Sequence, residues 1–567
     1  MKLTLIPALM LACTLVNAQV ITTPPVHSNI RAMAEWEEVQ ELNISWTDFP
    51  NILKQIVAAA RLESNVIILT EDVQETEDYL MSNNTGGTAF ANLDGISIIL
   101  APLNSIWTRD YSANPVYGNE VDSLFLVDWM YNRPRPDDDA SPVYIADELN
   151  LDLYETSESP FDLRYTGGNY MSDGFGTAFA SELILDENDG DGDFNIFYPD
   201  HSLAEIDGIM EEFMGIHTYI KMQTLPYDGI HHIDMHMKLV DEETLLVGEY
   251  PPGVADGPQI NANIDYILSN YTSKWGTPYR VVRMPMPDNT AGDFPDNGAS
   301  YRTYTNAVFV NNTIIFPTYR EEYDTTAYRI WGEVCPGYTL VGIDCDNNNS
   351  NIISQSGAIH CITHTVGVED PLLISHQPLH DTFDNLNPYT VVAYMNHRSG
   401  ISEARLYWKT STENVFSEIT MIDLGDNNWQ GLIPAQEPGT IVNYYVQGIA
   451  VSGKEQVRPM PAPEGFWTFK ILGEISAIND LSNISSSRIY PNPAGAITCI
   501  ELNTLRSDNI QIDLVDMTGR MVLNVFNGQT GNGMNKYFFD ASQIESGVYR
   551  VVISGLNGSD SIPVVIK

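Results

Sequence analysis

The chain has 567 residues, which is too long for one ordinary hydrophobic core, so we expect several domains. Hydrophobic residues make up 43% of the chain and charged residues 18%, a balance that excludes wholesale disorder. The 75 acidic and 28 basic residues give a formal net charge of -47, which excludes nucleic acid as a partner because such a surface repels phosphates. An acidic surface serves solubility in most proteins, and it would also attract cationic substrates.

The first 18 residues have the layout of a cleaved signal peptide. Lys2 is followed by an apolar run, and the small-residue exit Val16-Asn17-Ala18 predicts cleavage before Gln19. A lipoprotein anchored through Cys13 is the alternative. In both cases the sequence predicts export, to the medium or to the cell surface.

Residues 19–372 mix helices with short apolar strands, which predicts an α/β catalytic body of strand-helix units. In FPNILKQIVAAARLE the apolar residues share one helical face, namely Ile52, Leu53, Ile56, Val57 and Ala60. In HSLAEIDGIMEEF, Ser202 and Glu205 predict a capping box, and the expected buried stripe is Leu203, Ile206, Met210 and Phe213. The expected strands are VIILT, ISIILAP, FLVDWMY, TLLVGEY and VFVNNTIIFP.

Helical periodicity ends at about residue 372. Alternating strands such as ARLYWKT, WQGLIPA and IVNYYVQGIAV follow in residues 373–472, and they predict an all-β immunoglobulin-like sandwich. Residues 473–488 are a polar linker with too little apolar content to fold. Residues 489–567 form a last small β block with strands QIDLVDM and GVYRVVIS.

Four cysteines remain after the predicted cleavage. Cys335 and Cys345 flank a segment with Pro and Gly, so we expect a disulfide that closes this short loop. Cys361 and Cys499 are then single. Cys361, in GAIHCITH, could be an inert buried thiol, a partner of Cys499, or a protected nucleophile, and a nucleophilic cysteine needs a proton acceptor such as histidine.

The segment HHIDMH contains the best histidine candidate, His232. On a strand, His232, Asp234 and His236 would share a face as metal ligands do. No further ligand cluster such as HExxH or a CxxC pair accompanies them, so simple packing and a catalytic role remain as alternatives to a metal site.

Asp110, in WTRDY beside Trp107, and Asp234 could together bind a guanidinium group, whose planar donor fork fits carboxylates bidentately. Asp110 could equally form a structural ion pair with Arg109. In YNRPRPDDD, Arg133 and Arg135 lie on a proline-stiffened loop, which is either a solvated turn or a clasp for a carboxylate.

The stretch DENDGDGDFN has the acidic, glycine-rich look of a calcium loop, with candidate ligands Asp186, Asn188, Asp189, Asp191 and Asp193. Gly190 falls where the EF-hand pattern needs an oxygen ligand. A structural calcium and an acidic surface turn therefore both remain open.

Taken together, RAMAEWE, WTRDY, TGGN, DGFGTAFAS, HHID, the Tyr304/Asn306 strand and GAIHCIT resemble the guanidine-modifying superfamily, specifically agmatine deiminases and bacterial peptidylarginine deiminases. The resemblance covers roughly residues 31–365 and implies a five-bladed α/β propeller. It implies that Cys361 is the nucleophile, His232 the general acid/base, Asp110 and Asp234 the guanidinium clamps, and Asn306 a polar support. No cofactor is implied.

The YNRPRP loop and the following immunoglobulin-like domain resemble the bacterial peptidylarginine deiminases. That resemblance implies that Arg133 and Arg135 bind the α-carboxylate of a C-terminal arginine, so that arginine-containing peptides are the partners. A secreted agmatine deiminase, a metallohydrolase that uses HHIDMH, and a non-catalytic surface binding protein are the competing interpretations.

The last block resembles the C-terminal sorting domain of type IX secretion. The resemblance rests on Tyr490-Pro491-Asn492-Pro493, the turn Asp516-Met517-Thr518-Gly519-Arg520, the strand Ser546-Gly547-Val548-Tyr549 and the terminal VVIK. It implies that type IX secretion machinery is a partner and that Cys499 has no catalytic role.

Overall fold

In the computed structural model the described residues are 20–192, 194–347, 350–472, 484–495, 497–516, 519–542, 544, 546–555 and 558–567. The expected signal peptide, Cys13 and most of the expected linker lie outside them. The chain divides into two compact units. The larger contains residues up to Leu379, with Pro388–Pro434 and Val442–Phe469, and the smaller contains His380–Asn387, Ala435–Ile441 and Lys470–Lys567.

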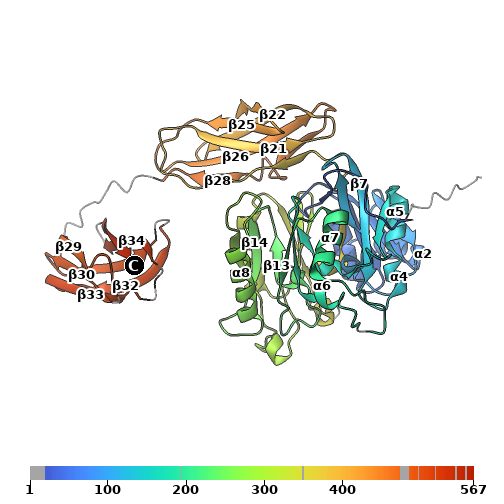
Figure 1. Ribbon diagram of the computed structural model, residues 1–567, viewed down its shortest axis with the longest axis horizontal. Coiled ribbons are helices and arrows are strands. Elements are labelled where there is room, and N and C mark those ends of the chain that lie inside the picture. The colour runs from blue at the N-terminus through green and yellow to red at the C-terminus, as the bar shows by residue number, and fades with distance from the viewer. Residues whose placement is uncertain are drawn as a thin grey trace, which may run out of the picture. The chain divides into compact units, whose positions relative to one another are not determined.

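The described residues between Val20 and Gly367 form five separate sheets that share one pattern (Figure 1). In each sheet two parallel strands are joined through helices, and a third strand pairs antiparallel with the first of them. The parallel pairs are β3(Val39–Trp46) with β4(Asn65–Thr70), β7(Ser123–Tyr131) with β8(Leu153–Thr156), β11(Thr177–Ser181) with β12(Thr218–Met222), β14(Thr244–Glu249) with β15(Arg280–Pro285), and β17(Thr313–Thr318) with β18(Thr339–Asp344).

The antiparallel strands are β19(His364–Gly367), β6(Asn114–Gly118), β10(Met171–Ser172), β13(Met237–Leu239) and β16(Val308–Val310). Because β19 pairs with β3, the last strand of this region closes the first sheet. The short strands β1(Val20–Ile21), β2(Arg31–Ala32) and β9(Arg164–Tyr165) extend the sheet of β7, and β5(Ile96–Leu100) extends the sheet of β3.

The helices lie in the connections between parallel strands. They are α1(Pro50–Ala60), α2(Val73–Leu80), α4(Pro136–Asp139), α5(Pro142–Leu149), α6(Leu183–Asp186), α7(Leu203–Met214), α8(Gly257–Asn270) and α9(Glu321–Val334). The five residues predicted to share one face of α1 are all buried, so that prediction is confirmed. Figure 1 shows α8 alongside the sheet of β13 and β14. Among the described residues, no helix has the length and apolarity needed to cross a membrane.

Helix α7 begins with the predicted capping box, in which Ser202 and Glu205 bond reciprocally to each other's backbone. Ile206, Met210 and Phe213 are buried as expected, but Leu203 is 54% exposed, so its placement in the buried stripe is wrong. Leu203 is the first residue of the helix, where the chain still runs along the surface.

Five short turns come directly before the five antiparallel strands, at equivalent positions of the repeated pattern. The turn α3(Thr108–Tyr111) precedes β6, η1(Gly167–Asn169) precedes β10, η2(Ile233–Met235) precedes β13, the loop with Asn306 precedes β16, and η5(His360–Ile362) precedes β19. The predicted Tyr304/Asn306 strand is therefore wrong, because Asn306 lies in the loop before β16 begins. HHID likewise ends before β13 begins.

Residues 373–472 are all-β, as predicted. One antiparallel sheet has the order β20(Leu373–Ser375), β21(Tyr389–Asn396), β25(Asn428–Ile433) and β24(Ile422–Gly425). The other has the order β23(Ser417–Thr420), β22(Ile401–Thr410), β26(Ile441–Ala450) and β27(Glu455–Arg458), with β28(Trp467–Lys470) also paired to β26. The absent side chain of Gly431 leaves room for Leu406 of the other sheet, since a Cβ there would lie 2.6 Å from it.

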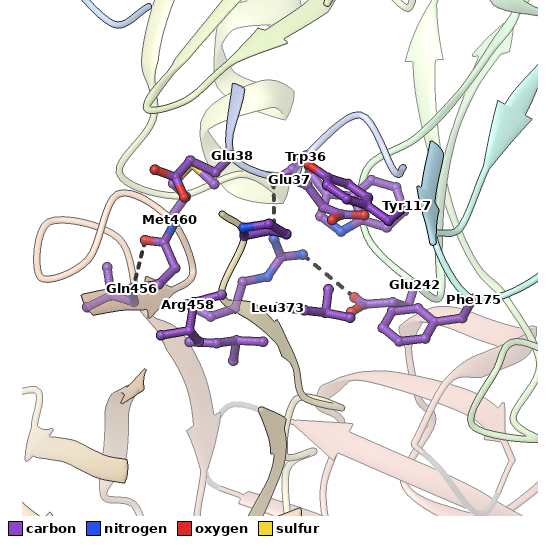
Figure 2. A pocket seen from close by; sticks show the side chains of 14 residues that line it. Trp36, Glu37, Glu38, Tyr117, Phe175, Glu242, Leu373, Gln456, Arg458 and Met460 are labelled. Atoms are coloured by element: carbon purple, nitrogen blue, oxygen red, sulfur yellow. Dashed lines mark hydrogen bonds and ion pairs between the residues drawn. The ribbon is translucent and has the colours of Figure 1, made fainter. Parts of the chain in front are cut away.

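Arg458 of β27 links this all-β region to the mixed region within the larger unit (Figure 2). Its guanidinium donates to the backbone oxygen of Trp36 at 3.3 Å and lies 3.7 Å from the carboxylate of Glu242. Both ionic side chains are largely buried, so the contact is shielded from solvent.

The smaller unit contains two antiparallel sheets at its C-terminal end. One consists of β29(Ile484–Tyr490), β30(Ile497–Thr504) and β33(Gly533–Asp540), and the other of β32(Met521–Gln529), β31(Asn509–Val515), β34(Gly547–Gly555) and β35(Gly558–Ile566). Alternate residues of β31 and β34 are buried, as the predicted strands require. Met517 and Thr518 of the expected turn lie outside the described residues.

The expected disulfide between Cys335 and Cys345 is absent, and both are free, buried thiols. Cys335 ends α9, whereas Cys345 follows β18, whose six residues span about 20 Å. A disulfide requires Cα atoms within roughly 7 Å of each other, and the segment between the two cysteines is a strand where we expected a turn. Cys361 and Cys499 are also free thiols.

These free thiols give a first prediction. Protein denatured without reductant should alkylate at Cys335, Cys345, Cys361 and Cys499, because none of them is paired. Peptide mass spectrometry measures the alkylation at each site. Recovery of a linked peptide that joins the segments of Cys335 and Cys345 would contradict the structure.

Helix α7 gives a second prediction. Replacing Phe213→Ala removes a ring that is 0% exposed and should destabilise the larger unit by about 3 to 5 kcal/mol. The matched control Leu203→Ala, in the same helix, should cost less than about 1 kcal/mol because Leu203 is exposed. Urea unfolding measures both, and equal losses would contradict the assigned buried face.

Candidate active site

Cys361, the predicted nucleophile, lies in η5 and is 2% exposed. The side chain of Asn306 fixes it from the neighbouring turn: Nδ2 lies 3.2 Å from the Cys361 Sγ, and Oδ1 accepts a hydrogen bond from the His360 backbone N–H at 2.9 Å. Asp234 Oδ2 lies 3.5 Å from the same sulfur. The structure therefore brings Cys361, Asn306 and Asp234 together, from three different turns.

Burial raises the pKa of the Cys361 thiol well above its usual range, and the charges of Asp234 and Asp110 raise it further. Hydrogen bonds from the Ala358 backbone and from Asn306 partly oppose this. The thiolate is thus disfavoured beside these two carboxylates, and a cation placed between them would favour it.

His232 and Asp110 approach each other from η2 and α3. His232 Nδ1 lies 3.5 Å from Asp110 Oδ1, and both side chains are largely buried. The approach requires glycine at position 168, because a Cβ there would lie 2.4 Å from His232 Nδ1 and 3.0 Å from Asp110 Oδ1. The TGGN segment thus belongs to the site through the space that Gly168 leaves.

The two aspartates respond differently to burial. Burial raises the pKa of Asp110; the charge of His232 opposes this effect, and that of Asp234 adds to it. Burial also opposes ionisation of Asp234, but the hydrogen bond and charge of His360, with the charges of His232 and Arg109, outweigh it and hold the pKa of Asp234 below its usual range. Asp234 is therefore the carboxylate whose negative charge is compensated by neighbouring groups of the protein.

That compensation comes from residues that the sequence analysis left without a role. His360 donates to Asp234 Oδ2 at 2.7 Å and lies 2.9 Å from Glu35 Oε1. Glu35 Oε2 is in turn bonded to the buried amino group of Lys238. Both His360 and Glu35 fall inside the quoted motifs GAIHCITH and RAMAEWE, and these motifs were the available signal.

A cavity of about 100 Å³ opens onto the thiol. Its lining contains six of the predicted site residues and four residues that the sequence analysis missed, namely Tyr131, Ile230, Gln355 and Ser356. The predicted residues in its lining are Trp107, Asp110, Arg133, Arg135, His232 and Cys361. Asp234 and Asn306 are not in the lining and contact the thiol within the fold.

The two arginines of the YNRPRP loop are held at this cavity by different contacts. Arg135 donates to the Tyr131 hydroxyl at 3.0 Å and to Ser105 Oγ at 3.2 Å. Arg133 bonds to the backbone oxygen of Asn132, and its guanidinium lies 4.9 Å from the ring centroid of Phe194. The loop therefore presents two cationic groups to the same cavity as Cys361.

The ring of Trp107 is seated against Gly357. A Cβ at that position would lie 2.2 Å from the Trp107 ring and 3.1 Å from the Cys361 Cβ. A larger residue at 357 would therefore displace the indole or the nucleophile. Gly357, the glycine of GAIHCITH, therefore allows the cavity wall to pack closely.

The three residues of the metal interpretation of HHIDMH do not alternate along one strand: His232 precedes a 3-10 turn, Asp234 lies within it and His236 follows it. Burial lowers the pKa of His236 to about 4, and neither of its buried ring nitrogens has a hydrogen-bond partner. Within the described parts of the chain, no three His, Cys, Asp or Glu side chains are grouped so that they could hold a metal ion.

The acidic stretch after α6 is partly committed to other contacts. The Asn188 side chain is buried, accepts from the Arg164 backbone N–H, and donates to the backbone oxygens of Arg164 and Ile184. Asp189 accepts from the backbone N–H of Asp191. Asp193 lies outside the described residues.

Proteins of similar sequence include putative agmatine deiminases. A putative agmatine deiminase of Legionella pneumophila (strain Paris) is 26% identical over 275 residues, which are 47% of this chain and 74% of the relative. A putative agmatine deiminase of Latilactobacillus sakei is 22% identical and covers 61% of this chain and 98% of the relative.

Two solved structures share the fold of the mixed region. The agmatine deiminase of Enterococcus faecalis is 17% identical, with a TM-score of 0.51, and the match covers 62% of this chain and all of that one. The putative arginine deiminase from Porphyromonas gingivalis is 19% identical, with a TM-score of 0.50, over 60% of this chain and 98% of that one.

Two family models match the chain. Residues 488–567 match the secretion system C-terminal sorting domain, which indicates export to the cell surface or beyond. Residues 31–366 match the Porphyromonas-type peptidyl-arginine deiminase, and these 336 residues are more than half of the 567. The chain therefore belongs to the Porphyromonas-type peptidyl-arginine deiminase family, whose members hydrolyse C–N bonds of guanidino groups.

Proposed function

We propose that the protein deiminates arginine in peptides, with preference for a C-terminal arginine, and releases a citrulline-containing peptide and ammonia. The observation that carries this proposal is one cavity lined by Cys361 and His232 together with Arg133 and Arg135. It combines a nucleophile and a proton carrier with two cationic groups that can receive a carboxylate.

The charge of the substrate supports the same assignment. A guanidinium stays protonated at any accessible pH, and its donor fork pairs with carboxylates such as those of Asp110 and Asp234. Its positive charge offsets the two carboxylates that raise the pKa of Cys361. Substrate binding would therefore favour the thiolate at the moment when the nucleophile is needed.

The proposed chemistry has two steps. The Cys361 thiolate forms a C–S bond to the guanidinium carbon, and His232 protonates the departing nitrogen, so that ammonia leaves and a thiouronium adduct remains. A water molecule then gives a proton to His232 and attacks the same carbon. The C–S bond breaks, and the thiolate and the ureido group of citrulline are released.

Agmatine deamination is the second candidate, because the relatives named above are called putative agmatine deiminases. Agmatine has no carboxylate, so it would leave the cationic groups of Arg133 and Arg135 without a partner. Two basic side chains held at a cavity therefore favour a peptide with a free C-terminus.

The proposal also covers the domain organisation of the chain. We take the five repeated sheets as a five-bladed α/β propeller in residues 19–372, and the two packed sheets as an immunoglobulin-like sandwich in residues 373–472. Residues 1–18 would be the signal peptide, 473–488 a linker, and 489–567 the type IX sorting domain. The reaction needs no cofactor, and a calcium ion near Asp186 and Asp189 would be structural.

The central test is a product assay. Reduced protein should form citrulline and ammonia from a peptide that ends in arginine, faster than from a peptide with internal arginine or from agmatine. Cys361→Ala should lower the rate at least about 10³-fold because the nucleophile is lost. Cys499→Ala, which removes another buried thiol, is the matched control and should keep full activity.

The absence of product from all three substrates would overturn the enzyme assignment in favour of a binding protein. Product from agmatine alone would replace the substrate with agmatine. Inhibition by chelators of protein that is otherwise active would support the metallohydrolase instead.

The substrate-recognition test uses Arg133→Ala. The variant should lose about 10- to 100-fold in kcat/KM on a peptide with a C-terminal arginine, because a charged hydrogen bond is worth about 1.5 to 3 kcal/mol. The same peptide with an amidated C-terminus lacks the carboxylate and serves as the control. An equal loss on both peptides would refute the carboxylate clasp.

A further inference from the structure

His360, the neighbour of the nucleophile, has no role in the proposed reaction, yet both of its ring nitrogens face carboxylates. Nδ1 lies 2.7 Å from Asp234 Oδ2, and Nε2 lies 2.9 Å from Glu35 Oε1. The side chains of His360 and Asp234 are 0% exposed, and that of Glu35 is 18% exposed. Water therefore has little access to these bonds.

Both contacts require the ring nitrogen to donate, because an ionised carboxylate can only accept. Burial opposes ionisation of Glu35, but the charges of His360, Lys238 and Arg109 outweigh it and hold its pKa well below the usual range. Two ionised carboxylates on opposite sides of one ring require a proton on each nitrogen. His360 is therefore placed to donate to both carboxylates at once.

The other charged and titratable groups near the His360 ring are Lys238, Arg109 and His364. Lys238 bonds to Glu35 Oε2, and Arg109 Nη1 lies 4.0 Å from Glu35 Oε1 while its Nε donates to the His360 backbone oxygen at 3.4 Å. Burial lowers the pKa of His364 well below its usual range, and the charge of Arg109 lowers it further, so His364 is neutral. Glu35 is the carboxylate that faces His360 from the side away from Asp234.

We propose that Glu35 and His360 are positioning residues that hold Asp234 ionised and turned toward the substrate. His360 occupies Asp234 Oδ2, whereas Asp234 Oδ1 is buried and has no hydrogen-bond partner. The free oxygen is the one left to accept a guanidinium N–H. The proposal rests on the proposed function, since it concerns the group that would bind the guanidinium.

The physical reason is the cost of an isolated buried charge. A carboxylate removed from water without a partner takes up a proton, and a protonated Asp234 could not pair with a guanidinium. A single buried cation beside Asp234 would itself need compensation, and Glu35 provides it. The charges proposed for Glu35, His360 and Asp234 thus alternate between negative and positive, and Asp234 lies next to the Cys361 thiol.

The test compares Glu35→Gln with Glu37→Gln. Glu37 lies two residues further along, is also largely buried, and forms an ion pair with Arg31 at 2.5 Å, so its variant controls for the loss of any buried carboxylate in this segment. Without the anion of Glu35, the His360 ring loses the carboxylate that accepts from its Nε2. For Glu35→Gln we expect kcat/KM to fall at least about tenfold, which is the usual effect of losing a residue that orients a ligand of a site. We also expect the alkaline limb of the pH profile of kcat/KM to move to lower pH.

His360→Asn keeps a donor near Asp234 but cannot carry charge. In this background kcat/KM should no longer depend on residue 35, so adding Glu35→Gln should cause no further loss of kcat/KM. A Glu35→Gln variant that is folded by circular dichroism and has the pH profile of Glu37→Gln would overturn the proposal. Additive losses in the double variant would also overturn it.

A second readout does not depend on the substrate. Alkylation of Cys361 by iodoacetamide at alkaline pH should be slower in Glu35→Gln than in Glu37→Gln, because a neutral His360 leaves Asp234 uncompensated beside the thiol. Faster or equal alkylation would mean that His360 keeps its proton without Glu35, and would contradict the proposal. If the wild-type protein forms no deiminated product, the proposed function fails, and this readout still decides the role of Glu35.

Discussion

The carboxylate of Asp234 is completely buried, 3.5 Å from the sulfur of Cys361, and the whole site depends on how its charge is compensated. His360 compensates it from within the protein, and the guanidinium of the substrate would do so from the cavity. The same charge raises the pKa of the thiol in the free protein. Under the proposed function, a thiol that stays protonated until a cation arrives would be protected from side reactions outside the cell.

The repeated pattern of the fold explains how five distant segments reach one place. Each sheet presents a short turn before its antiparallel strand, and these turns supply Asp110, Gly168, Asp234 with His232, Asn306 and Cys361. The pairing of β19 with β3 joins the end of this region to its beginning. Because the site draws on all five turns, a defect in any one repeat would disturb the geometry around the thiol.

The sequence was sufficient for features with a local cause. The periodicity of α1 and the capping box of α7 follow from residues within one or two helical turns. The motifs also predicted residues that the structure brings together around Cys361, such as Asn306 and Asp234. The predicted burial of Leu203, the predicted pairing of Cys335 with Cys345 and the strand expected at Asn306 were wrong, because burial, separation and turn geometry depend on tertiary packing. The contact between Glu35 and His360 was missed because the two residues are 325 positions apart, and no local sequence pattern links residues so distant.

Under the proposed function, substrate choice would depend on Arg133 and Arg135, which line the cavity and contact Tyr131 and Phe194. The central claim is that Cys361 forms a covalent adduct with the guanidinium carbon. Rapid acid quenching during the first turnover, followed by peptide mass spectrometry, tests it directly. We predict that the Cys361 peptide gains the mass of the substrate less one ammonia. Citrulline formation with an unmodified Cys361 throughout, or with an adduct on another residue, would contradict the account.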